Sequence, residues 1–410
     1  MKTFIAAIPL FDSVMKVEAY YLCDKTSDRL LGTAHDFQAM GEALLTRGLD
    51  LVDEVGIDAF TGGMPLFVEL NQFQLLMDVP TNKNIEADKL VCVLPENIAR
   101  DAAIVSKCEN LKSRGYKLAQ KMGKLEAGRD KLYSLMDFIL VSYKNIGSPT
   151  WLRKMAYEKR AVVEEIPDAE TYERLAVVPN TYFSGTFYSR PITKGATQIS
   201  PLKINALQLL KQVNEIDSDL TQIARIIERD PAISISLLRF INSPAVRVSR
   251  KIESIPSAVA ILGQKEMKRW VTVAVSVSLA EDRPSEITKL SLVRAKFAEN
   301  LATAYEMGAL APSLFMAGLF SLLDVILEKP MEEAIKEVAV DERVKRTLVD
   351  KTGDLYEVLD LIYAYEKANW DMVSVNMIRN NVQTEAVTKA FIEALVWYKE
   401  LLSGIDDVSA

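Results

Sequence analysis

A change in hydrophobic periodicity near residue 195 constrains the fold of this chain more than any other feature of its sequence. Before this point, short apolar runs such as LVCVL at 90–94 and RAVVEEI at 160–166 alternate with intervals of helix length. After it, apolar residues recur at helical spacing, as at Leu207, Leu210 and Val213. Repeated strand–helix units predict a parallel sheet covered by helices, and their number favours a closed barrel over an open sheet. The predicted fold class is α/β plus all-α, with a TIM-like barrel followed by a helical domain.

Turn-forming residues mark the boundary between these halves. Residues 190–201 are rich in turn formers and show little apolar periodicity. A chain of 410 residues is also too long for one ordinary core. We therefore predict a barrel domain at residues 1–192 and an all-helical domain at residues 193–410.

Histidine is nearly absent, with His35 alone in 410 residues. Because histidine is the commonest metal ligand and the usual general base near neutral pH, its scarcity excludes a His-rich metallohydrolase centre. The net charge of -7 disfavours unspecific binding to nucleic acid or to an anionic membrane, and we expect neither as a partner. Three cysteines at unrelated spacings suggest a reducing cytoplasm. The longest apolar run that we identify, Trp270–Ala280, is too short to span a bilayer, so the predicted location is cytoplasmic.

Several short motifs follow one another in the helical half. Asp230 before Pro231 can cap a helix, Ser254 can cap the next one, and Gly263 can end it. The order and spacing of DPAIS, LLR, NS and IES resemble the HDOD domain of bacterial signalling proteins. The motif residues are Asp230, Pro231, Arg239, Asn242, Ser243, Ser254 and Gly263.

The HDOD resemblance also implies where a metal centre has been lost. Related HD phosphohydrolases hold a metal on a His–Asp pair, and the equivalent positions in AGLFSLLDVI are Ser321 and Leu322. The upstream position that often carries histidine lies near Arg294. Serine and leucine cannot replace imidazole and carboxylate as ligands. We expect a packed core helix here and no bound metal.

The amino-terminal half is similar to the EAL domain, a barrel whose active members hydrolyse cyclic di-GMP with Mg²⁺ or Mn²⁺. The resemblance rests on FIAAIPLF at 4–11, TGG at 61–63 and SGTFYSRP at 184–191. The whole arrangement resembles the two-domain EAL–HDOD family. The predicted barrel is therefore a degenerate EAL barrel followed by an HDOD domain.

The resemblance implies that the EAL chemistry is lost, because the ligand positions hold other residues. The equivalents of its metal-binding and catalytic positions are Tyr21, Glu69, Val93, Lys121, Met122, Leu140 and Ser142. Glu96 and Glu164 are the carboxylates that remain nearby. Metal-assisted hydrolysis needs several convergent oxygen ligands, and a lysine at a former aspartate puts a positive charge where the cation would lie. We expect no catalytic residue and no cofactor.

These observations favour a non-catalytic cytoplasmic regulator that acts through protein partners. Binding of cyclic di-GMP is disfavoured, and a homodimer is left open. One alternative is a phosphodiesterase with an unorthodox carboxylate cluster of Glu69, Glu96 and Glu164. Another is a cyclic di-GMP receptor in which Arg190 and Lys121 hold phosphates. Nucleic-acid binding by Lys265, Lys268 and Arg269 is a further alternative, although this spacing equally suits a solvated helix face.

Overall fold

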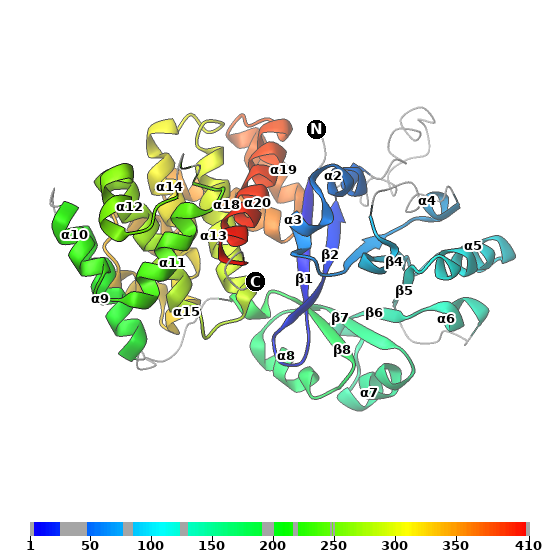
Figure 1. The fold of residues 1–410 in the computed structure, drawn as a ribbon. Coiled ribbons are helices and arrows are strands. Elements are labelled where there is room, and N and C mark those ends of the chain that lie inside the picture. The colour runs from blue at the N-terminus through cyan, green and yellow to red at the C-terminus, as the bar shows by residue number, and fades with distance from the viewer. Residues whose placement is uncertain are drawn as a thin grey trace. The chain divides into compact units, whose positions relative to one another are not determined.

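The computed structural model describes residues 4–24, 47–76, 85–123, 130–190, 201–215, 220–246, 248 and 251–406. Its chain forms two compact units (Figure 1). The first unit comprises Met1–Tyr188 with Ala364–Asp371, and the second comprises Ser189–Tyr363 with Met372–Ala410. His35 and most of the predicted linker at 190–201 lie outside the described residues. The predicted division between residues 192 and 193 stays a prediction.

The first unit is a closed barrel of eight strands in sequence order, as predicted. The strands are β1 (Ile5–Phe11), β2 (Val17–Asp24), β3 (Leu66–Glu69), β4 (Leu90–Leu94), β5 (Lys117–Met122), β6 (Phe138–Ser142), β7 (Arg160–Ile166) and β8 (Thr181–Gly185). From β2 to β8, neighbouring strands pair in parallel.

The prediction of a parallel sheet is wrong for β1, which pairs antiparallel with both β2 and β8. The reason is the short connection between β1 and β2. Asp12 begins a tight turn in which its Oδ1 accepts hydrogen bonds from the backbone N–H groups of Val14 at 2.8 Å and Lys16 at 2.9 Å. A parallel pair needs a crossover of a dozen or more residues, so this turn permits only a hairpin.

Helices connect the later strands and begin at defined caps. The barrel helices are α2 (Arg47–Val55), α3 (Ile57–Thr61), α4 (Gln72–Leu76), α5 (Ala102–Ser113), α6 (Lys131–Leu135), α7 (Pro149–Glu158) and α8 (Ala169–Ala176). Four of them begin after a side chain that accepts a hydrogen bond from a backbone N–H of the first turn. These caps are Asp101, Asp130, Ser148 and Asp168. Each cap lies between a barrel strand and the helix that follows it, and it defines where that helix begins.

A segment close to the carboxyl terminus completes the first unit. The hydroxyl of Tyr365, which is fully buried, accepts a hydrogen bond from the backbone N–H of Ile5 at 3.2 Å. The Phe4 ring stacks on that of Trp370, with centroids 5.6 Å apart. The barrel unit is therefore built from two stretches of chain that are far apart in sequence.

The described residues of the second unit form helices and turns. The helices are α9 (Pro201–Glu215), α10 (Leu220–Ile227), α11 (Pro231–Asn242), α12 (Ile255–Leu279), α13 (Ser285–Leu301), α14 (Ala311–Leu319), α15 (Leu323–Leu327), α16 (Met331–Ala334), α17 (Glu342–Val349), α18 (Asp354–Glu366), α19 (Trp370–Arg379) and α20 (Thr384–Asp406). The end of α18 and the start of α19 lie within Ala364–Asp371 and therefore belong to the first unit. The predicted all-α architecture of this half is confirmed.

One described stretch, Gly308–Leu327, is long and apolar enough to cross a membrane by length and composition, and 72% of an 18-residue window within it is buried inside the structure. It is longer than Trp270–Ala280, so our identification of the longest apolar run was wrong. The stretch is divided into α14, α15 and the 3-10 helices Gly308–Leu310 and Phe320–Leu322. Its burial accounts for its apolar composition without a membrane.

Candidate functional site

Four of the predicted site residues converge at the carboxyl ends of the barrel strands. Tyr21, Glu69, Lys121 and Glu164 lie on β2, β3, β5 and β7. Alternate residues of a strand face the same side of the sheet. The residues two positions earlier, Ala19, Phe67, Ala119 and Val162, belong to the barrel's interior core. The alternation therefore turns all four polar side chains toward the inside of the barrel.

Direct contacts join three of these side chains. The Lys121 ammonium donates a hydrogen bond to Glu69 Oε2 at 2.7 Å. The Tyr21 hydroxyl donates to the same oxygen at 2.8 Å. Lys121 Nζ also lies 5.0 Å from the centroid of the Tyr21 ring. We name Tyr21, Glu69, Lys121 and Glu164 the barrel ion cluster.

The fourth member, Glu164, interacts with this ion pair electrostatically. Burial raises the pKa of Glu164, the positive charge of Lys121 lowers it, and the negative charge of Glu69 raises it, so the pKa lies above its usual value. Burial would lower the pKa of Lys121, but Glu164 and Glu69 raise it above its usual value. Lys121 is therefore charged near neutral pH and faces two carboxylates.

The other predicted barrel positions do not add oxygen ligands to the cluster. Val93 and Leu140 are fully buried in the apolar interior. The Ser142 hydroxyl donates a hydrogen bond to Glu165 Oε2 at 2.7 Å instead of joining the cluster. Glu96 is exposed beyond the end of β4, and its carboxylate lies against Gly123.

This donor set does not fit the pair of divalent cations that the EAL resemblance implies. Two carboxylates face an ammonium, and the neighbouring inward positions Val93 and Leu140 offer no oxygen. Within the described ranges, no three His, Cys, Asp or Glu side chains come together as a group that could hold a metal ion. Mg²⁺ and Mn²⁺ prefer several oxygen ligands, so a lysine inside the cluster opposes their binding.

The structure also brings together Arg294 and Ser321 in the helical unit. Arg294 Nη1 donates a hydrogen bond to Ser321 Oγ at 3.0 Å, and both residues are buried. The Arg294 guanidinium carbon lies 4.9 Å from the centroid of the Tyr363 ring. Leu322 is buried in the apolar core, as predicted for a core helix. A cationic side chain, Arg294, therefore lies where the HDOD resemblance implies a lost metal centre, as Lys121 does in the barrel.

Gly318 allows the helices at this position to approach closely. A Cβ added at Gly318 would lie 2.6 Å from backbone atoms of Arg294 and Ala295 on α13. The Ser321 hydroxyl donates to the Gly318 carbonyl at 2.6 Å. The close contact of α14 with α13 thus places Ser321 beside Arg294.

The HDOD motif residues stabilise local structure. Asp230 Oδ1 accepts a hydrogen bond from the Ile233 N–H at 3.0 Å and caps α11, in which Pro231 opens the first turn. Ser254 caps α12, and Gly263 interrupts this helix with a φ of 74°. The side chain of Asn242 donates to the Ile252 carbonyl and accepts from the Ile252 N–H, both at 2.7 Å.

The two remaining motif residues lie near the end of α11. Ser243 is buried, and its hydroxyl donates to the Phe240 carbonyl at 2.7 Å. Arg239 lies in the last turn of α11 and is half-buried.

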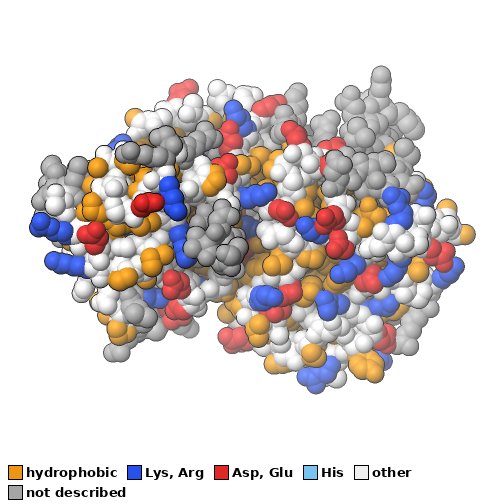
Figure 2. Space-filling view, in the orientation of Figure 1, with side chains coloured by type: hydrophobic (Ala, Val, Ile, Leu, Met, Phe, Trp, Pro, Cys, Tyr) orange, Lys and Arg blue, Asp and Glu red, His pale blue; other side chains and the backbone are white. Residues whose placement is uncertain are grey.

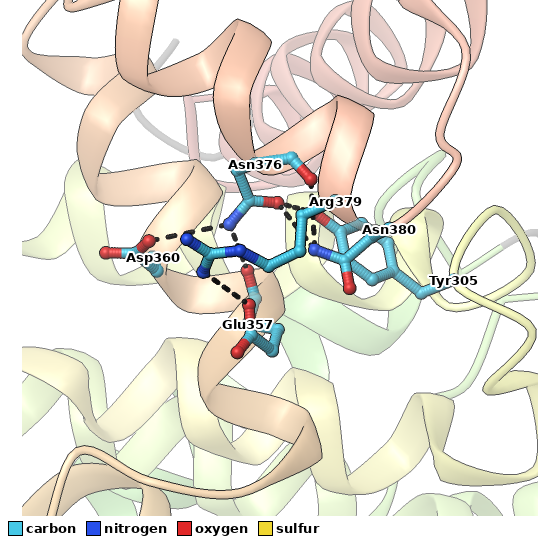
Figure 3. A network of polar contacts seen from close by, with 6 residues as sticks. All are labelled: Tyr305, Glu357, Asp360, Asn376, Arg379 and Asn380. Carbon is cyan, nitrogen blue, oxygen red and sulfur yellow. Dashed lines mark hydrogen bonds and ion pairs between the residues drawn. The ribbon is translucent and has the colours of Figure 1, made fainter.

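A polar network in the helical unit escaped the sequence analysis (Figure 3). The buried Tyr305 hydroxyl donates to Asn376 Oδ1 at 2.6 Å, and Asn376 Nδ2 donates to the Glu357 carbonyl at 2.9 Å. Asn380 Nδ2 donates to Asn376 Oδ1 at 3.1 Å. The network ties α19 to α18 and to the turn after α13. Its members are common residue types at separate places in the chain, so no sequence signal identifies it.

Cys23 also escaped the sequence analysis of the barrel. It is partly buried against the barrel's interior core. Burial raises the pKa of the Cys23 thiol to about 12, although Lys121 opposes the shift. Its position two residues after Tyr21 on β2 could have identified it as inward-facing.

The basic residues considered for nucleic-acid binding do not all form an open patch. Arg269 Nη1 pairs with Glu299 Oε1 at 2.8 Å, and the Arg269 guanidinium carbon lies 4.0 Å from the centroid of the Phe315 ring. On the face shown in Figure 2, acidic and basic side chains are interspersed.

Comparison with known proteins finds a family model and two relatives that match this chain. The HDOD domain model matches residues 199–352. The Bacillus subtilis protein YuxH is 29% identical over 420 residues, which cover 98% of this chain and 100% of that protein. The cyclic di-GMP phosphodiesterase CdgJ of Vibrio cholerae is 30% identical over 243 residues, which cover 59% of this chain and 56% of that protein.

Solved structures match the barrel. An EAL domain protein from Listeria monocytogenes has a TM-score of 0.36 at 14% identity, and the match covers 46% of this chain and 88% of that one. The HDOD resemblance predicted from the motifs is confirmed. The HDOD family model thus identifies an HDOD domain at residues 199–352, which follow the eight-stranded barrel.

Proposed function

We propose that this chain is a non-catalytic, cytoplasmic signalling protein whose barrel no longer hydrolyses cyclic di-GMP and whose HDOD domain is a platform for protein partners. The main support is the ion pair between Lys121 and Glu69 at 2.7 Å, inside the barrel and at the carboxyl ends of its strands. In TIM barrels this is the end at which active sites are built.

The chemistry of phosphodiester hydrolysis explains why this ion pair matters. Metal ions in such sites activate a water and stabilise the charge that develops on the phosphate oxygens. In this barrel Glu69 accepts hydrogen bonds from Lys121 and Tyr21, which occupy one of its carboxylate oxygens. The arrangement is suited to stabilising the barrel interior and lacks the convergent ligands that a hydrolytic centre uses.

The rival function is phosphodiesterase activity, which the name of the Vibrio cholerae relative describes for that protein. The decisive measurement is turnover of cyclic di-GMP by the full chain with Mg²⁺ or Mn²⁺, beside an active EAL enzyme as positive control. We expect no product above the level without enzyme. Turnover that disappears in Glu164→Gln would refute the proposal and establish an unorthodox carboxylate site.

Binding of cyclic di-GMP without hydrolysis is tested separately. We expect no binding in the barrel, because Lys121 is already paired with Glu69 and is not free to hold a phosphate. Calorimetry with cyclic di-GMP and the full chain would measure this directly. Saturable heat that is lost in Lys121→Met would favour the receptor alternative.

The proposed role of the HDOD domain needs evidence of where a partner binds. We expect chemical crosslinking of the full chain in its native cytoplasm to join lysines of residues 201–406 to another protein. Crosslinks between two copies of this chain would show a homodimer instead. Crosslinks to other proteins confined to the barrel would contradict the platform role.

A further inference from the structure

The charges of the barrel ion cluster do not balance. Lys121 contributes one positive charge, whereas Glu69 and Glu164 contribute two negative charges when both are ionised. The side chains of Lys121 and Glu69 are only about one-third exposed, at 32% and 30%. Carboxylates that lie close together and away from water repel each other unless a cation lies near them.

Lys121 lies where it can act on both carboxylates. Its ammonium contacts Glu69 at 2.7 Å, and Glu164 is the strongest of the charged groups that raise the Lys121 pKa. The three residues come from β5, β3 and β7, which surround the same interior. The ammonium therefore contacts Glu69 on β3 and interacts electrostatically with Glu164, whose side chain faces the same interior from β7.

We propose that Lys121 is an internal counter-cation that does the structural work of a divalent ion, and that Glu69 and Glu164 form a latent cation site which Lys121 blocks. This inference rests on the proposed loss of the metal centre. Replacing Lys121 with a carboxylate would remove the ammonium and add a third oxygen donor. Three carboxylates facing one another are the ligand type that Mg²⁺ and Mn²⁺ bind.

The test is thermal unfolding of the full chain with and without millimolar Mn²⁺ for the wild type and Lys121→Asp. The wild type should show no rise in Tm with Mn²⁺. Lys121→Asp should lose about 3–6 °C without metal, as is typical of a modest destabilisation in a domain of this size, and should recover at least half of the loss with Mn²⁺. Addition of a chelator should reverse the recovery.

Lys144→Asp is the matched control. Lys144 pairs with Glu165 at 3.3 Å, but their side chains are 65% and 59% exposed. The same substitution should change the Tm little there and should not respond to Mn²⁺. If Lys121→Asp does not fold, Lys121→Ala retains the two carboxylates and should show a weaker Mn²⁺-dependent rise.

A Tm of Lys121→Asp or Lys121→Ala that is insensitive to Mn²⁺ would overturn the inference, as would an equal rise in the wild type or in Lys144→Asp. Failure of the proposed function gives a different result. Hydrolysis of cyclic di-GMP by the wild type would refute that function, whereas an absent Mn²⁺ response in the variants refutes only the latent site.

Discussion

Gly318→Ala tests whether the close contact between α14 and α13 is a requirement of the helical core. The added Cβ would lie 2.6 Å from the Ala295 nitrogen and from the carbonyl carbon and oxygen of Arg294. All of these are backbone atoms, so no side-chain rotation relieves the clash. The two helices must separate by about 0.8 Å to reach the 3.4 Å at which an ordinary contact begins.

Destabilising and stabilising contributions together set the change in the free energy of unfolding. Forcing an extra carbon into a packed core costs about 1–3 kcal/mol, and the separation also weakens the Arg294–Ser321 hydrogen bond, which contributes about 1 kcal/mol. Alanine is more favourable than glycine within a helix by about 0.5–1 kcal/mol. We therefore expect Gly318→Ala to lower the free energy of unfolding by about 1–3 kcal/mol.

Urea unfolding of the full chain, followed by tryptophan fluorescence, measures the change. Trp270 and Trp397 lie in the helical unit with their ring centroids 6.4 Å apart, so they report on its core. Gly308→Ala is the matched control, because a Cβ there would meet no atom of the described ranges within 4 Å. A Gly318→Ala protein as stable as Gly308→Ala would refute the packing argument.

Two further predictions concern the barrel. Both side-chain polar atoms of Gln120 are buried without a hydrogen-bond partner among the described residues, so Gln120→Met should raise the free energy of unfolding by about 1 kcal/mol. An unchanged or lower urea midpoint would contradict this. Because burial raises the pKa of Glu164 above 4.5 in the folded state, its contribution to stability falls as the pH rises from 4.5 through the folded pKa. Glu164→Gln should therefore raise the Tm near neutral pH and lose that advantage in acid. A hydrogen bond from Ser142 lowers the pKa of the neighbouring Glu165, so the contribution of Glu165 is lost as the pH falls and Glu165→Gln should give the opposite trend. If the Tm of Glu164→Gln and that of Glu165→Gln change in the same way with pH, the opposite directions of the two pKa shifts are contradicted.

Periodicity was sufficient to predict strands such as Leu90–Leu94 and Arg160–Ile166, but we did not predict from it which residues face the barrel interior. Alternation along β3 and β5 places Glu69 and Lys121 on the inner side once Phe67 and Ala119 are recognised as core residues. It could not predict that the two side chains would touch, because contact depends on the register between strands and on rotamers. The antiparallel direction of β1 was missed because strand–helix repetition masked the short hairpin turn at Asp12.

In the helical half too, features that depend on neighbouring residues were predicted, and contacts between residues far apart in sequence were not. The cap at Asp230 and the break at Gly263 were predicted because each depends on a few neighbouring residues. The hydrogen bond between Arg294 and Ser321 joins residues 27 positions apart, and that between Tyr305 and Asn376 joins residues 71 apart. Periodicity describes one helix at a time and does not reveal which helices meet.

Because Ala364–Asp371 belongs to the barrel unit, this unit cannot be completed until a segment far along the chain is available. The strand containing Ile5 is synthesised before Tyr365, the residue 360 positions later whose hydroxyl its N–H contacts. Closing so long a loop carries an entropic cost that local strand pairing does not. On the ribosome, the eight strands can pair while Phe4 still lacks Trp370 beside it. The barrel strands can thus pair before the segment that completes the barrel unit has been synthesised.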